Sequence, residues 1–125
     1  MAATGDCYGQ SYRALNLIED NAEYYRAIFK MTPRQTFKLV HGSVFATNVK
    51  TKKKQRILHA WIEGGNKVWE PYHAQTWSKK KFYKEWEAKS YGKFNRTQAA
   101  VMILTRNHLG PWAGPQKDGP VNRGR

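Results

Sequence analysis

The stretch HAWIEGGNKVWEP, residues 59–71, determines how the rest of this 125-residue chain is interpreted. Two runs rich in β-branched and aromatic residues flank Gly64 and Gly65, and a glycine pair tolerates the positive φ angles of a tight hairpin turn. We therefore expect two antiparallel strands, at Ile57 to Glu63 and at Asn66 to Tyr72, with Gly64-Gly65 as the loop between them.

This register makes His59 and Glu70 direct cross-strand neighbours. Directly opposed residues share one face of a sheet with their Cβ atoms about 5 Å apart, so the carboxylate can orient the imidazole and stabilise its charged form. A loop at Gly65-Asn66 would instead place His59 opposite Tyr72 and remove this geometry. The other interpretation of His59 and Glu70 is a polar pair on a solvated strand face.

Helices and one further strand are expected around the hairpin, so the sequence predicts an α+β fold. A single domain over residues 1–112 and a flexible basic Gly/Pro-rich tail over 113–125 fit the length and composition. In chain order the other expected elements are one helix or two over Tyr8–Phe29, with a break at Asp20-Asn21 as the second option, a strand over Thr36–Thr47, an exposed basic loop over Asn48–Arg56, a helix after Trp77, and a helix that opens at Asn95 or Thr97 and closes at Gly110-Pro111.

Cys7 is the only cysteine in the chain. Asp6 is a good N-cap residue, which would place Cys7 in the first turn of a helix, where the helix dipole favours a reactive thiolate. A lone cysteine at such a place is otherwise an inert small residue. With one cysteine no internal disulfide and no thiolate metal site can form, which favours a reducing, intracellular compartment.

The order Cys7, His59, Glu70, with Ala-Trp after the histidine and Pro71 after the acid, resembles the transglutaminase-like branch of papain-type cysteine enzymes. The phrases LVHG at residues 39–42 and GPW at 110–112 resemble small phage and bacterial members of that group. The resemblance implies a papain-like core in which an N-terminal helix carries the cysteine and packs on a short antiparallel sheet.

The same resemblance implies a cysteine-dependent hydrolase or acyltransferase that uses Cys7, His59 and Glu70 as a triad. The substrate would be a protein or a small amide or acyl compound. Two features depart from the family: glutamate replaces the usual aspartate, and no glutamine precedes the cysteine to form an oxyanion hole. The backbone N–H of Cys7 is the first candidate donor to an oxyanion, and Gln10, one helical turn further on, is the second.

Other residues leave alternatives open. His41 or His73 would replace His59 as the base in another register, and Trp61 and Trp69 either line a substrate cleft or fill the core. The chain lacks metal-binding and phosphate-loop motifs, so we expect no metal and no cofactor.

Charge supports a rival function. With 22 Lys and Arg against 9 Asp and Glu, the formal net charge is +13, which attracts nucleic acid or an acidic protein. A noncatalytic nucleic-acid-binding or phage structural protein active in virion assembly is therefore the alternative. With no membrane span or signal segment recognised, the expected location is the cytoplasm, that of the host cell if phage-encoded, or the virion. The candidate polyanion-binding residues are Lys52, Lys53, Lys54, Lys79, Lys80 and Lys81.

Overall fold

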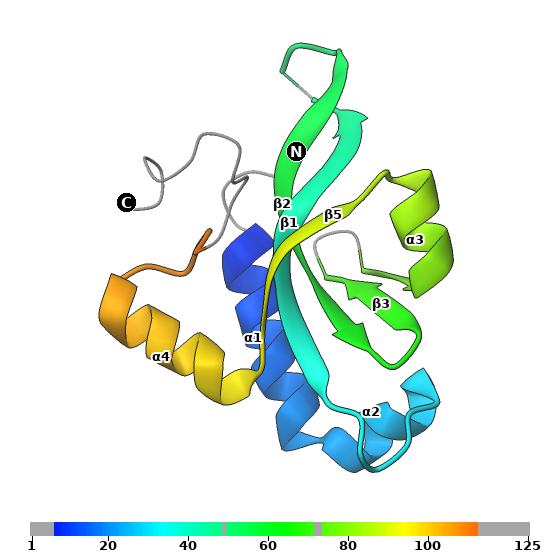
Figure 1. Cartoon of the computed structure of the whole chain (residues 1–125), viewed down its shortest axis with the longest axis vertical. Helices are drawn as coiled ribbons and strands as arrows, with labels where there is room; N and C mark the ends of the chain where they lie inside the picture. Colours follow the sequence, from blue (N-terminus) through cyan, green and yellow to red (C-terminus); the bar gives the residue numbers. More distant parts are fainter. Residues whose placement is uncertain (1–6, 49, 72–73, 113–125) are drawn as a thin grey trace.

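A computed structural model of the chain describes residues 7–48, 50–71 and 74–112. The architecture is α+β, as predicted, with one five-stranded antiparallel sheet of strand order β4-β3-β2-β1-β5 and helices around it (Figure 1). The elements are α1 (Cys7–Asp20), α2 (Ala22–Phe29), β1 (Phe37–Thr47), β2 (Lys54–Gly64), β3 (Lys67–Glu70), β4 (Gln75–Ser78), α3 (Lys79–Glu85), β5 (Lys89–Phe94) and α4 (Arg96–Arg106).

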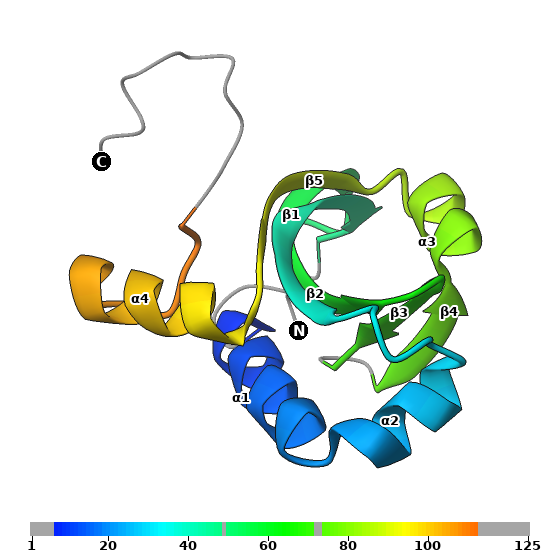
Figure 2. The same cartoon turned by 60° about the horizontal axis from the view of Figure 1, so that its bottom comes forward.

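The two long central strands carry the sheet. Strands β1 and β2 pair without interruption from Phe37 opposite Gly64 to Thr47 opposite Lys54. The sheet curls strongly, with α1 on its outer side and α3 beside its inner side (Figure 2). Because side chains alternate along a strand, each of the two faces buries its own apolar cluster.

The outer cluster joins α1 to the sheet. Leu15 and Ile18 lie on one stripe of α1 at helical spacing and pack against Leu39 of β1 and Ile62 of β2. The inner cluster holds Trp61, which is completely buried, with its neighbours from three elements. Those neighbours are Val40, Val44, Val68 and Phe82.

The structure confirms two of the predicted helix boundaries and corrects a third. The segment from residue 7 to 29 is two helices that break at Asn21. Asn95 is the N-cap of α4, and its capping box with Gln98 satisfies free backbone N–H groups at the helix start. The predicted stop at Gly110-Pro111 is wrong, because Asn107 adopts the left-handed conformation and ends α4 three residues earlier.

The hairpin loop is Gly65-Asn66, so the predicted Gly64-Gly65 loop is wrong. Gly64 is the last residue of β2 and pairs with Lys67, while Gly65 supplies the one positive φ of the turn. A Cβ on Gly64 would lie 2.7 Å from a ring carbon of Phe29. Gly64 is therefore required by packing against α2 rather than by the turn.

Two strands were missed. These are the short β4 and the edge strand β5, which have few apolar residues and so give no clear strand pattern in the sequence. The basic loop predicted over Asn48–Arg56 is shorter than expected, because β2 already begins at Lys54. The tail over 113–125, Asp6 and His73 lie outside the described residues.

Candidate functional site

The structure brings His59 and Glu70 together. The Nε2 atom of His59 lies 2.7 Å from the Oε2 atom of Glu70, and both side chains are buried. A carboxylate can only accept a hydrogen bond, so when the ring of His59 is neutral, ionised Glu70 holds the ring proton on Nε2. The lone pair of the imidazole is then on Nδ1.

The contact forms although the register differs from the prediction. Ile62 pairs with Trp69, and extending that register places Glu70 opposite Trp61, two residues from His59. His59 and Glu70 are therefore diagonal neighbours on one face of the sheet, within reach of a long side chain. The additional methylene of glutamate helps to span this diagonal.

Cys7 is the first residue of α1, as predicted, and it is completely buried. Its side chain packs with Tyr8 and with Ala60 of β2. The backbone of Ala60 hydrogen-bonds to the thiol, and that N–H belongs to the peptide group that follows His59. The helix start thus places the sulfur directly beside the strand that carries the histidine.

The expected lowering of the thiol pKa is wrong. Burial raises the pKa of Cys7 to about 12, and hydrogen bonding from the Ala60 backbone only partly offsets this effect. The negative charge of Glu70 raises the pKa further, whereas the backbone N–H groups of Cys7 and Tyr8 lower it. Desolvation of the thiolate therefore outweighs the helix dipole, and Cys7 is a neutral thiol at pH 7.

The thiol and the imidazole approach β2 from different sides. Ala60 lies on the outer face with Ile62, whereas His59 alternates to the inner face with Trp61 and Glu70. Consistent with this placement, no hydrogen bond joins the Cys7 thiol to Nδ1 of His59, two residues that the structure describes. Catalytic hydrogen bonds are often incomplete before substrate binds and tighten in the complex.

His41 is a poor alternative base. It is completely buried on the outer face, and its Nδ1 accepts the backbone N–H of Trp112 at 3.2 Å. Burial lowers the pKa of His41 to about 3, with a smaller effect from His108. With Nδ1 occupied as an acceptor, the neutral ring carries its proton on Nε2 and offers no free lone pair.

The remaining site candidates take different positions. Gln10 is half-buried on α1, one turn after Cys7. Trp61 and Trp69 lie on opposite faces of the sheet, and Trp61 is completely buried, which supports a core role for it. Gly42 pairs with His59, and the missing side chain leaves room for the Trp61 ring, which a Cβ would approach to 2.7 Å.

A buried carboxylate that the sequence analysis missed lies further along the inner face. Glu63 accepts hydrogen bonds from Nε1 of Trp61 at 3.0 Å, from Nζ of Lys93 at 2.8 Å and from the Tyr83 hydroxyl. Burial by itself would raise the pKa of Glu63, but these hydrogen bonds and the charge of Lys93 lower it below the usual value. Its signal in the sequence is its position two residues after Trp61, on the buried face of the strand.

The basic runs lie in two places. Lys52, Lys53 and Lys54 are exposed at the turn between β1 and β2, and Lys54 lies 6.0 Å from the Phe45 ring centre. Lys79, Lys80 and Lys81 form the first turn of α3.

Within residues 7–48, 50–71 and 74–112, no group of three acidic, histidine or cysteine side chains could hold a metal ion. None of the described helices is long and apolar enough to cross a membrane.

Comparisons with known families, curated proteins and solved structures find no match for this chain. The resemblance to transglutaminase-like enzymes therefore depends on sequence motifs alone, namely Cys7, the hairpin, and the phrases LVHG and GPW.

Proposed function

We propose that the chain is a cysteine-dependent acyl-transfer enzyme in which Cys7 is the nucleophile, His59 the general base and Glu70 the residue that orients His59. The observation that carries the proposal is the buried His59–Glu70 pair at 2.7 Å, next to a helix start whose thiol contacts the peptide group after His59. A papain-like or transglutaminase-like core is part of the same proposal.

The chemistry follows from the protonation states. Because Cys7 starts as a neutral thiol on the other side of β2, its sulfur and Nδ1 of His59 have to come within hydrogen-bond distance when a substrate binds. The thiol proton then moves to Nδ1 as the sulfur attacks an amide, isopeptide or thioester carbonyl. Glu70 stabilises the imidazolium through Nε2. The imidazolium then protonates the leaving amine or thiol, a thioester forms on Cys7, and water or an amine releases the acyl group.

The site offers donors for the developing oxyanion. The backbone N–H groups of Cys7 and Tyr8 at the start of α1 lie close enough to the sulfur to lower the pKa of the thiol. We assign oxyanion stabilisation to the N–H of Cys7 first and to Gln10 second. The burial of Cys7 means that an acyl substrate has to open a path to the sulfur before it reacts.

Alkylation by iodoacetamide at pH 7, followed by intact mass spectrometry, tests the role of His59. A thiol with a pKa of about 12 is almost fully protonated at this pH, so alkylation depends on a nearby base. We expect His59→Gln to slow alkylation by about tenfold or more. Glu70→Gln, which keeps the side-chain shape but loses the charge, should slow it less.

The control separates activation of the thiol from opening of the structure. Amide hydrogen exchange at Ala60 reports local opening beside the sulfur. If exchange is unchanged while alkylation slows, His59 acts on the thiol. Equal alkylation rates in the wild type and His59→Gln would contradict the proposal and leave the pair as a structural feature of the core.

A further inference from the structure

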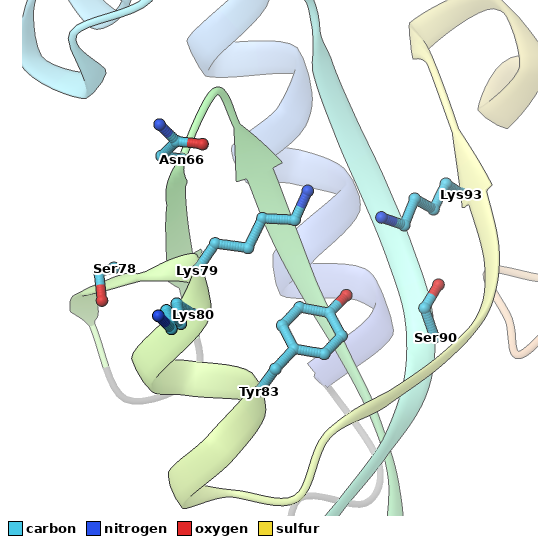
Figure 3. Close-up of a pocket in the computed structure, with 7 residues that line it drawn as sticks. All are labelled: Asn66, Ser78, Lys79, Lys80, Tyr83, Ser90 and Lys93. Carbon is cyan, nitrogen blue, oxygen red and sulfur yellow. The ribbon is translucent and has the colours of Figure 1, made fainter.

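The inner side of the sheet carries a pocket that the proposed chemistry does not use. It has a volume of about 710 Å³ and lies between α3 and the edge strand β5. Figure 3 shows the ammonium ends of Lys79 and Lys93 directed toward one another, with the Tyr83 hydroxyl between these two side chains. The lining residues are Asn66, Ser78, Lys79, Lys80, Tyr83, Ser90 and Lys93.

Two lysines of this pocket contact one buried carboxylate. Glu63 lies 2.8 Å from Nζ of Lys93 and 3.4 Å from Nζ of Lys79, and its side chain is 5% exposed. Lys80 also lines the pocket, and no acidic partner holds it within the part of the chain that the structure describes. One ammonium is sufficient to balance Glu63, so the pocket retains an excess of about two positive charges.

Polar groups that can donate to a ligand accompany these charges. Asn66 reaches the pocket from the hairpin loop, and Ser90 reaches it from β5, where its side chain also hydrogen-bonds to Tyr83. The Ser78 hydroxyl accepts the backbone N–H of Lys81, which leaves its own proton for another acceptor. Donors therefore approach the cavity from several directions, and an acceptor with several oxygen atoms would satisfy more than one of them.

We propose that this pocket binds a phosphate group. A phosphate monoester carries a charge between about −1.5 and −2 at pH 7 and several acceptor oxygens, which matches both the excess charge and the number of donors. The Tyr83 ring and the aliphatic stems of the lysines provide apolar surface for the group esterified to the phosphate. The proposal concerns a site separate from Cys7 and is independent of the acyl-transfer function.

Amide chemical shifts of the full chain, followed at constant ionic strength, test this site with two probes. Thymidine 5′-monophosphate represents a free phosphate ester, and a short oligothymidylate represents a single nucleic-acid strand. We expect saturable shifts in α3 and β5. Lys80→Ala should raise the Kd about tenfold, because a hydrogen bond to a charged group is lost.

Lys53→Ala is the matched control, because it removes an equal charge from the exposed β1–β2 turn. It should change the Kd by less than about twofold, since screening weakens a distant surface charge. A larger effect of Lys80→Ala on either probe supports the pocket, and the tighter probe identifies the source of the phosphate. Equal effects of the two variants, or no saturable shift in α3 and β5, would overturn the proposal.

Discussion

Replacing Gly42 with alanine is expected to lower the free energy of unfolding by at least about 3 kcal/mol. A Cβ at this position would lie 2.0 Å from the backbone oxygen of Lys89 and 2.7 Å from the Trp61 ring. Overpacking of a core typically destabilises by about 1–3 kcal/mol, and here the backbone of β5 has to move as well. Urea unfolding of Gly42→Ala measures the loss.

The reverse exchange in the same strand is the control. Ala46→Gly removes a methyl group near the end of β1 and should lower the free energy of unfolding by about 1 kcal/mol or less. If Gly42→Ala is as mild as Ala46→Gly, then β5 and Trp61 do not pack as closely on β1 as the structure shows. The same close packing concerns the site, because Gly42 is the β1 residue that pairs with His59.

Acid is expected to destabilise the protein through His41. Its pKa is about 3 in the folded chain because burial disfavours the charged ring, whereas an ordinary histidine titrates near 6.5. Between these values the unfolded chain binds a proton that the folded chain does not bind. The free energy of unfolding should therefore fall by roughly 3 kcal/mol as the pH is lowered from 6.5 to 4.

His41→Gln removes this titration while its amide oxygen can still accept the N–H of Trp112. Urea unfolding at several pH values should give a flatter profile for the variant over the same range. Glu63, whose pKa is lowered in the folded state, adds a loss below its ordinary pKa of about 4.5 in both proteins. Parallel profiles above that pH would contradict the role assigned to His41.

The sequence predicts the central strands and the helices because their apolar spacing and end residues are strong local signals. The prediction for β1 begins within one residue of the observed strand, and Asn95, one of the two helix starts that the sequence allowed, is the N-cap of α4. Strand β5 could not be predicted in the same way, because Lys89–Phe94 is held by pairing with β1 and has no buried residue of its own. Such strands depend on tertiary contacts rather than on local pattern.

The candidate site, like the fold, could be predicted only in part from the sequence. The pairing of His59 with Glu70 was predicted from a loop that the structure corrects, and the contact survives because a diagonal neighbour is still within reach. The raised pKa of Cys7 could not be predicted, because burial depends on the packing of α1 against Ala60. The role of Glu63 depends on Lys93 and Tyr83, which only the folded chain brings together.

The most direct test of the central claim is to trap the acyl group on Cys7. The chain would be incubated briefly with p-nitrophenyl acetate at pH 7 and mapped by peptide mass spectrometry. We expect a hydroxylamine-sensitive acetyl thioester on Cys7 in the wild type and almost none in His59→Gln. Acetylation confined to lysines, or equal acetylation of Cys7 in both proteins, would contradict the assignment of this histidine and cysteine as an acyl-transfer centre.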